Sequence, residues 1–290
     1  MATNTPFGQR LGLVLEGGAM RGIYTAGVLD IFLEAGIMPD VVVGVSAGAL
    51  HGCSYVAGQK GRSIRYYRKY RSDKHFMGLY SLLTTGDVVG TKFCYEDIPL
   101  RLDPFNEAAF EKAPVDFYVT VTNVRTGKPE YILCDELKVG SKMDVIRAGA
   151  SMPLCSKMVE WNGNLYLDGG VSDSSPYAKT KDFGGRKSIV VLTQPAGYLK
   201  QPAAMAPFEA MYRKYPAFVE AMRGRDQMYN TEVCAVEQAA NPGDVFLIRP
   251  SKLLHVGRME HDIEVLNAQY ELGRQDARNQ MDAMREWIER

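Results

Sequence analysis

The sequence predicts an α/β protein with a parallel sheet. Two observations support this. Short apolar runs rich in valine, isoleucine and leucine are typical of buried strands, and segments whose apolar residues recur at helical spacing come between them. The order strand, helix, strand, helix already appears within residues 11–57. This alternation is the usual pattern of a parallel sheet covered by helices.

The first part of the chain contains two predicted strands, each followed by a helix. Residues 11–15 are an apolar run that ends at Gly17 and Gly18, as expected for a strand entering a tight turn. A helix is predicted over residues 24–34, with Gly36 as its stop signal. The second strand begins at residue 41, and a helix follows over residues 47–57.

The middle of the chain contains further strands and a hairpin. Strands are predicted over residues 117–122 and 131–133, a helix over residues 143–150, and a core strand over residues 188–192. Two short strands, residues 159–161 and 165–167, flank Asn162 and Gly163. This dipeptide tolerates positive φ, so it favours a hairpin turn.

The composition changes after Pro195. Residues 207–238 are predicted to be mostly helical, residues 245–248 to form a last strand, and residues from about 260 onward to form a helix. We expect a single domain over residues 1–290, with a core of residues 10–195 and a mainly helical part of residues 196–290. The helical part either covers the site as a lid or completes the outer layer of the sheet.

Composition excludes several classes of protein. The 290 residues carry 34 basic and 34 acidic side chains, and 46% are hydrophobic, which are globular proportions. A balanced charge gives no indication of a nucleic-acid partner. Five widely spaced cysteines without a C-x-x-C pair argue against a structural zinc site and a disulfide framework. We expect no metal and no cofactor.

We predict no targeting segment and no membrane span. The first twenty residues lack the basic region of a signal peptide. Residues 41–59 carry no charge, but their glycines, serines and histidine make them too polar for a membrane helix. We therefore expect a soluble, cytoplasmic protein, whose only contact with membranes would be peripheral.

Ser46 is the candidate nucleophile. It lies in Gly44-Val-Ser-Ala-Gly48, between a predicted strand and a predicted helix. A serine at such a sharp turn points outward, and the glycines remove Cβ atoms that would clash there. The helix that follows offers unpaired N–H groups for a developing oxyanion. The structural alternative is that both glycines only allow close packing of helix and strand.

A serine needs a base, and two candidates remain open. His255 follows a predicted strand in the order serine, aspartate, histidine of an α/β-hydrolase, but that fold needs more strands before its nucleophile. Asp168 ends a predicted strand and precedes Gly169 and Gly170. An aspartate has a pKa of about 3.9, so burial would have to raise it. Alternatively, Asp168 only caps its own turn.

A glycine-rich segment, Glu16-Gly-Gly-Ala-Met-Arg-Gly22, joins the first strand to the first helix. Its backbone N–H groups suit either a dinucleotide phosphate or an oxyanion. The dinucleotide fingerprint G-x-G-x-x-G fails because Ala19 occupies its third position, where it requires glycine, and because no acidic residue ends the second strand. The oxyanion hole is therefore favoured.

These motifs together resemble the patatin-like phospholipase family. Gly17-Gly-Ala-Met-Arg-Gly22, Gly44-Val-Ser-Ala-Gly48 and Asp168-Gly-Gly170 occur in the family's order and spacing, over about residues 10–195. Ala150, Ser151 and Pro153 also look like the family. The resemblance implies a three-layer α/β/α fold with a mostly parallel central sheet. The sequence departs from the family at Ala19, where many members have glycine; a positive φ there would cost energy.

The resemblance also implies a mechanism without histidine. Ser46 would attack an acyl ester with Asp168 as its base, the amides of Gly17, Gly18 and Ala19 would form the oxyanion hole, and Arg21 would orient that loop. The expected partner is a lipid or another acyl ester. Alternatives are a non-catalytic regulatory or lipid-binding protein on the same fold, the His255 esterase, and acyl transfer in place of hydrolysis.

Two further segments bear on lipid access. Residues 62–74 interleave six basic residues with three tyrosines, which suits an anionic membrane surface or, alternatively, a solvated helix with its tyrosines packed inward. Four methionines at residues 205, 211, 222 and 228 either line an acyl pocket or fill the core.

Overall fold

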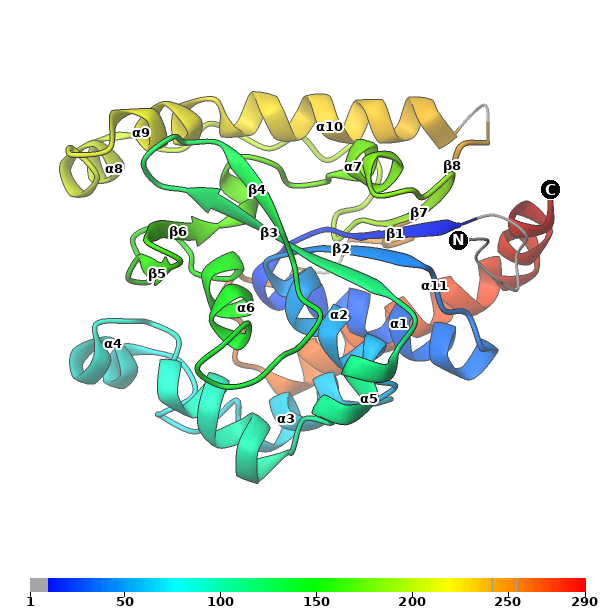
Figure 1. The fold of residues 1–290 in the computed structure, drawn as a ribbon, viewed down its shortest axis with the longest axis horizontal. Coiled ribbons are helices and arrows are strands. Elements are labelled where there is room, and N and C mark those ends of the chain that lie inside the picture. The colour runs from blue at the N-terminus through cyan, green and yellow to red at the C-terminus, as the bar shows by residue number, and fades with distance from the viewer. Residues whose placement is uncertain (1–9, 241–242, 254) are drawn as a thin grey trace.

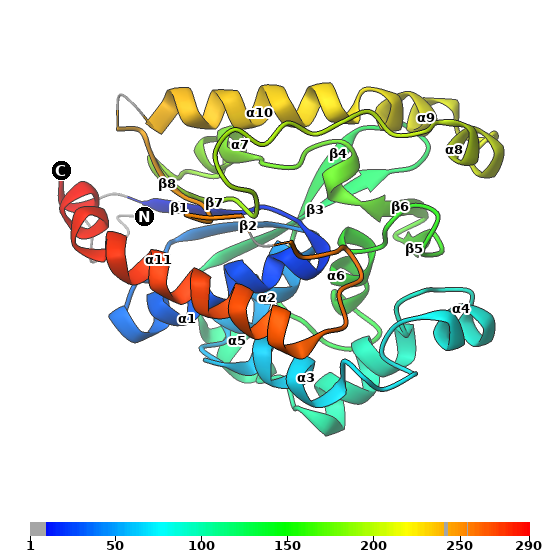
Figure 2. The ribbon, with the colours of Figure 1, turned by 180° about the vertical axis from the view of Figure 1, so that it is seen from behind.

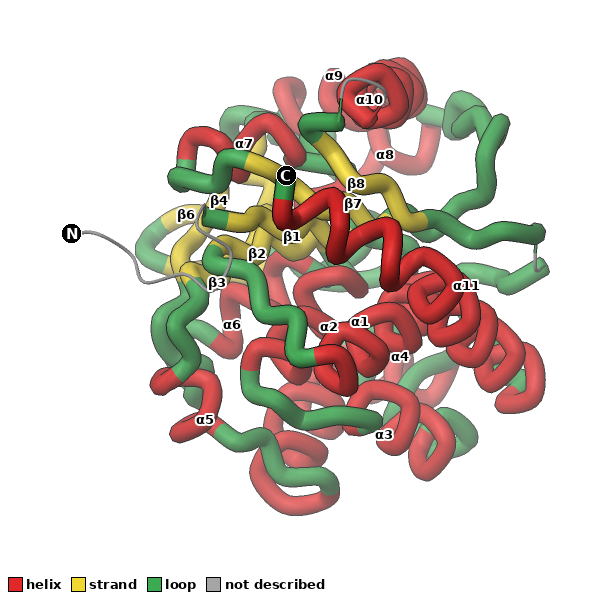
Figure 3. Tube along the Cα trace, turned by 90° about the vertical axis from the view of Figure 1, so that its right-hand side faces the viewer, coloured by secondary structure: helices red, strands yellow, loops and turns green. Residues whose placement is uncertain are grey.

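An eight-stranded sheet runs through the molecule, with helices on both of its faces (Figures 1 and 3). The structure is a computed structural model that describes residues 10–240, 243–253 and 255–290, so residues 1–9 of the predicted domain lie outside the described residues. The strands are β1 (Leu11–Leu15), β2 (Val41–Val45), β3 (Asp116–Asn123), β4 (Pro129–Leu133), β5 (Val159–Trp161), β6 (Asn164–Asp168), β7 (Lys187–Val191) and β8 (Val245–Ile248).

The centre of the sheet is parallel and one end of it is antiparallel. The strand order is β5-β6-β3-β2-β1-β7-β8, and β4 also pairs with β3. Strands β3, β2, β1, β7 and β8 run parallel to their neighbours in this order, whereas β4 and β6 run antiparallel to β3. The prediction of a mostly parallel sheet is confirmed. The hairpin is also confirmed, because Asn162 and Gly163 have φ values of 47° and 76° between β5 and β6.

Helices cover the two faces of the sheet, which confirms the three-layer prediction (Figures 1 and 2). One face carries α7 (Tyr177–Asp182), α8 (Ala206–Met211), α9 (Pro216–Arg223) and α10 (Arg225–Ala240). The other carries α1 (Ile23–Ala35), α2 (Ala47–Val56), α3 (Arg62–Tyr70), α5 (Glu107–Lys112), α6 (Met143–Gly149) and α11 (Ile263–Glu289). The remaining helical segments are η1 (Ala19–Gly22), α4 (Leu79–Thr85), the π-helical η2 (Phe93–Leu102) and η3 (Gly169–Val171).

The part of the chain after Pro195 contributes to both helical layers. Helix α11 packs along α1, where the Tyr24 hydroxyl donates to Asp276 at 3.0 Å and the Tyr270 hydroxyl donates to Asp30 at 2.5 Å. Helix α10 covers the opposite face beside β8. The helical part therefore completes the outer layers, and α10 also reaches the site described below.

Helix α3 lies in the basic, tyrosine-rich segment of residues 62–74, and it packs its tyrosines inward, as the second interpretation of that segment expected. Tyr66, Tyr67 and Tyr70 are buried, and Arg65 is paired with Asp103 through both oxygens of the carboxylate. The aromatic side chains are therefore not available to a membrane surface. No helix among the described residues is long and apolar enough to cross a bilayer.

Candidate active site

Strands β2 and β6 meet end to end on the same edge of β3. Val45 lies opposite Thr120, and Asp168 lies opposite the next residue, Val121. Strand β4 pairs with β3 across both of these positions, so β4 occupies one edge, and β2 and β6 share the other. Because β2 is parallel and β6 antiparallel to β3, their carboxyl ends point at each other. This register brings Ser46, which directly follows β2, beside Asp168.

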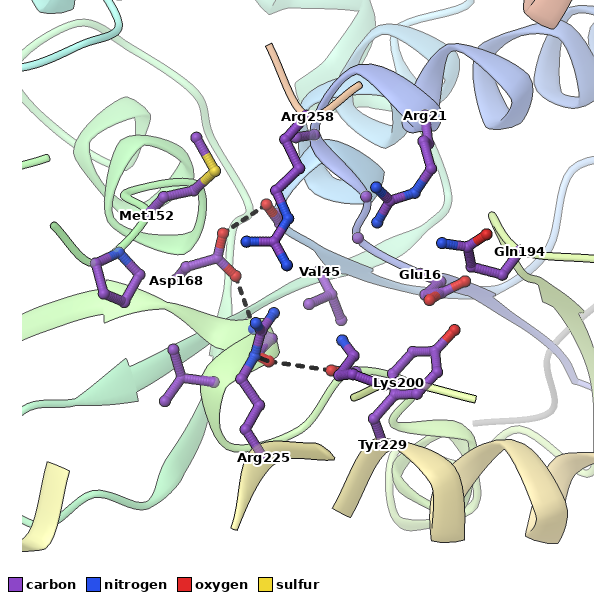
Figure 4. A pocket seen from close by; sticks show the side chains of 18 of the residues that line it. Glu16, Arg21, Val45, Met152, Asp168, Gln194, Lys200, Arg225, Tyr229 and Arg258 are labelled. Carbon is purple, nitrogen blue, oxygen red and sulfur yellow. Dashed lines mark hydrogen bonds between the residues drawn. The ribbon is translucent and has the colours of Figure 1, made fainter. Parts of the chain in front are cut away.

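Ser46 and Asp168 form a buried hydrogen-bonded pair. Figure 4 shows the Asp168 carboxylate among the other side chains that line the cavity beside it. The Ser46 hydroxyl donates to Oδ2 of Asp168 at 2.6 Å, and the Gly170 N–H donates to Oδ1 at 2.8 Å. The backbone of Asp168 is also held, because its N–H donates to the Ser151 carbonyl at 2.9 Å. Both carboxylate oxygens thus have fixed partners, and the one facing Ser46 is placed to accept its proton.

The turn at Ser46 is strained and depends on its glycines. Ser46 has φ 52° and ψ −121°, a region that side-chain-bearing residues rarely occupy. A Cβ at Gly48 would lie 2.2 Å from the Leu15 carbonyl oxygen, and one at Gly44 would lie 2.5 Å from Cα of Ala49. Both glycines are therefore needed for the close approach of α2 to β1 and β2, as the packing argument from sequence expected.

The glycine-rich loop presents unpaired donors beside Ser46. Within the described residues, the N–H groups of Gly17, Gly18 and Ala19 have no hydrogen-bond partner. Gly17 lies against Ser46, since a Cβ on it would be 2.8 Å from the serine Cβ. Ala19 has φ 50°, so it adopts the costly conformation that the sequence analysis anticipated. Such unpaired amides suit a developing oxyanion.

The pair opens into a cavity of about 700 Å³. The predicted residues Gly17, Gly18, Ala19, Arg21, Ser46, Asp168 and Gly170 all line it. Gly22, Gly44, Gly48 and Gly169 do not line it, and pack against neighbouring backbone or small side chains behind it. Pro153, from the segment that looked like the family, is also part of the wall.

Burial raises the pKa of Asp168 above its ordinary value, whereas the Ser46 hydroxyl and the positive charge of Arg225 lower it. The Gly170 N–H and Lys200 act in the same direction as Arg225. The net effect is a raised pKa of Asp168, which makes its carboxylate a better base than that of a solvated aspartate.

A group of charged and polar side chains in the cavity was missed from the sequence. Arg225 donates from Nε to the Gly170 carbonyl at 2.6 Å, and Lys200 lies over the Tyr229 ring at 3.9 Å. Glu16 is buried and accepts from the Thr193 N–H and hydroxyl. Arg225 and Tyr229 are four residues apart on α10, and that spacing, which places them on one helix face, was the available signal.

The histidine alternative receives no support from hydrogen bonding. His255 lines the cavity but is exposed, and in the described residues no hydrogen bond joins it to Ser46 or Asp168. His51 is buried behind the site, where burial lowers its pKa to about 4. No group of acidic, histidine or cysteine residues in the described part of the chain has the arrangement of a metal site.

A second, apolar cavity of about 100 Å³ also begins at Ser46. Ser46, Ala19 and Met152 line both cavities. The second one extends between α2, α3, η2 and α6, and its walls include Tyr67, Phe76, Ile98 and Met143. Of the methionines proposed for an acyl pocket, Met222 is buried and lines the larger cavity, whereas Met211 is 59% exposed.

Comparison with known families gives two matches along the chain. A family model described as patatin-like phospholipase matches residues 13–179, so the resemblance inferred from the motifs is confirmed. A second model, a domain of unknown function named DUF6363, matches residues 215–289. The division into a single domain with a core of residues 10–195 stays a prediction.

Individual proteins are also similar. The chain is 28% identical over 273 residues to the uncharacterized protein YjjU of Escherichia coli, covering 91% of this chain and 75% of YjjU. It is 29% identical over 182 residues to lysophospholipase nte1 of Aspergillus terreus, covering 61% of this chain but only 11% of that protein. The crystal structure of VipD from Legionella pneumophila matches with a TM-score of 0.49 and 13% identity, covering 97% of this chain and 69% of VipD.

Proposed function

The chain belongs to the patatin-like phospholipase family, and on this basis we propose that it is a serine acyl hydrolase that cleaves ester bonds of lipids. Family membership and the similarity to a lysophospholipase support a lipid hydrolase. The observation that carries the proposal is the 2.6 Å hydrogen bond between Ser46 and Asp168, beside three unpaired backbone donors.

In the first half-reaction, Asp168 takes the hydroxyl proton as Oγ of Ser46 attacks the ester carbonyl carbon. The carbonyl oxygen becomes an oxyanion that the amides of Gly17, Gly18 and Ala19 stabilise. When the tetrahedral intermediate collapses, the carbon–oxygen bond to the alcohol breaks. The protonated Asp168 gives its proton to the leaving alkoxide, and an acyl group remains on Ser46.

In the second half-reaction, Asp168 accepts a proton from water, which attacks the acyl-serine carbonyl carbon. The same amides stabilise the second oxyanion. Collapse releases a fatty acid and returns the proton to Oγ of Ser46, so the pair is restored. The raised pKa of Asp168 favours both proton transfers. It reduces the difference in pKa between the carboxyl group and the groups with which it exchanges protons.

The apolar cavity is the proposed site of the acyl chain. It begins at Ser46, and its walls are mostly aromatic and aliphatic, so an acyl chain there would lose contact with water. Its volume of about 100 Å³ leaves room for no more than one chain. We therefore take a lipid ester with a single acyl chain as the simplest substrate that this cavity fits.

Helix α4 is the proposed contact with a lipid surface. It exposes Leu79 by 69% and Leu83 by 76%, one helical turn apart. Its flanking residues Met77 and Val89 pair with each other and line the apolar cavity. Insertion of α4 into a lipid surface would place the apolar cavity next to acyl chains. This arrangement suits a cytoplasmic enzyme whose contact with membranes is peripheral.

Hydrolysis of a short-chain p-nitrophenyl ester tests the proposal. We expect turnover in the unmodified protein and its loss in Ser46→Ala and Asp168→Asn. Active Asp168→Asn with inactive His255→Ala would favour the histidine mechanism instead. Absence of turnover on all esters would favour the non-catalytic alternative. Product analysis with competing alcohols would separate hydrolysis from acyl transfer.

A further inference from the structure

Four basic side chains converge on the larger cavity beside Ser46. Arg21, Lys200, Arg225 and Arg258 line it, and Figure 4 shows them around the space between Asp168 and Glu16. Arg21 lies in η1 within the glycine-rich segment, and Lys200 lies between β7 and α8. Arg225 begins α10, and Arg258 lies between β8 and α11. Segments far apart in sequence thus place positive charge around one space.

The two carboxylates of the cavity, Glu16 and Asp168, offset only part of this charge, because four basic side chains line the same space. Glu16 is occupied by the Thr193 N–H and hydroxyl, and Asp168 by Ser46 and Gly170. In the described part of the chain, none of the four basic side chains forms an ion pair with a carboxylate within 4.0 Å. The cluster is therefore short of negative charge in the free protein.

The donors of the cluster are largely unused. Nε of Arg21 is buried without a hydrogen-bond partner. Arg225 engages only its Nε in the described structure, on the Gly170 carbonyl. Burial, together with the nearby Arg225, Arg21 and Arg258, lowers the pKa of Lys200 to about 7, against the opposing effect of Glu16. An anion in the cavity would relieve this repulsion and satisfy the free donors.

Of the two cavities that meet at Ser46, one is apolar and the other is lined by basic side chains. This difference sets the direction in which an ester would lie across the site. The apolar cavity suits the acyl chain, so the alcohol part lies in the cationic cavity. Guanidinium groups match phosphate oxygens in both geometry and charge. An alcohol that carries a phosphate would therefore satisfy both cavities at once.

We propose that Lys200, Arg225 and Arg258, with Arg21, form a subsite for the phosphate of a single-chain acyl ester, such as a 1-acylglycerol 3-phosphate. This rests on the proposed ester hydrolysis at Ser46. Lys200, Arg225 and Arg258 lie outside residues 13–179, which the family model matches. The part of the chain after the matched residues thus supplies three of the four basic side chains of the subsite.

Binding to the full chain tests the subsite independently of catalysis. We expect isothermal titration calorimetry to detect glycerol 3-phosphate and, more weakly, inorganic phosphate, but not glycerol. Lys200→Gln should weaken glycerol 3-phosphate binding about tenfold, the scale of one charge-assisted hydrogen bond. Lys252→Gln is the matched control, since Lys252 is exposed and does not line the cavity. If inorganic phosphate binds as tightly as glycerol 3-phosphate, the headgroup assignment is overturned.

Arg258→Gln is a second variant, because this exposed loop side chain has no hydrogen bond in the described structure that the fold depends on. We expect it to weaken glycerol 3-phosphate as well. If Lys200→Gln and Arg258→Gln both bind it as tightly as the unmodified protein and Lys252→Gln, the subsite is disproved.

Substrate selectivity gives a second readout. We expect kcat/KM for a 1-acylglycerol 3-phosphate to exceed that for the monoacylglycerol of equal chain length, and this ratio to fall about tenfold in Lys200→Gln. Equal ratios in the two proteins would overturn the inference while Ser46-dependent hydrolysis stands. Binding of glycerol 3-phosphate without hydrolysis of any ester would support the subsite and defeat the proposed function.

Discussion

Replacement of Asp168 by asparagine should abolish the base while leaving the shape of the site. Oδ1 of Asp168 is fixed by the Gly170 N–H at 2.8 Å, so the asparagine oxygen would take that position. The amide nitrogen would then face Ser46, whose hydroxyl now donates to Oδ2 at 2.6 Å. An amide NH₂ is a donor and cannot accept the serine proton.

The expected loss follows from the role of the base. General-base catalysis contributes about 10²–10⁴-fold, which corresponds to about 3–5 kcal/mol of transition-state stabilisation. We expect kcat for a p-nitrophenyl ester to fall by this factor in Asp168→Asn. Asp282→Asn, an exposed position on α11, is the matched control and should retain full activity.

Thermal unfolding separates loss of the base from loss of the fold. Burial raises the pKa of Asp168, so the folded protein disfavours the charged carboxylate. Above that raised pKa the charge lowers stability, and a neutral asparagine removes this cost. Asp168→Asn should therefore melt at or above the temperature of the unmodified protein. Retained activity, or a lower melting temperature together with lost activity, would refute this reasoning.

Three further outcomes are expected. Gly48→Ala places a Cβ 2.2 Å from the Leu15 carbonyl oxygen and should cost at least about 1–3 kcal/mol in thermal or urea unfolding, whereas Gly224→Ala, with its nearest atom at 3.8 Å, should be tolerated. Leu83→Ser should weaken binding to lipid vesicles about tenfold while turnover of a soluble ester is unchanged, and equal vesicle binding would contradict a contact through α4. Because burial raises the pKa of Asp168, kcat/KM should fall as pH drops through a value above 3.8, and an acidic limb at or below 3.8 would contradict this.

The elements that sequence predicted correctly are those with local signals. Apolar runs predicted β1, β2, β3 and β7, and the Asn162-Gly163 dipeptide predicted the hairpin turn. The pairing of Ser46 with Asp168 was inferred from the family resemblance, and the structure brings the two side chains together. Periodicity alone could not have placed them, because their meeting depends on the register of two strands along one edge of β3.

The cationic side of the cavity could not be predicted in the same way. Lys200, Arg225 and Arg258 lie in three segments whose proximity depends on how α10 and the loop before α11 pack on the sheet. Each is an ordinary charged residue in its local sequence. Helices α4 and α5 were also missed, since seven and six residues are too few for a clear period.

The central claim is that Ser46 is the nucleophile and that Asp168 activates it. The most direct measurement is labelling of the full chain with an alkyl fluorophosphonate, followed by peptide mapping by mass spectrometry. The account predicts one adduct, on Ser46, that forms much more slowly in Asp168→Asn. An adduct on another residue, or equal labelling of Ser46→Ala, would contradict it.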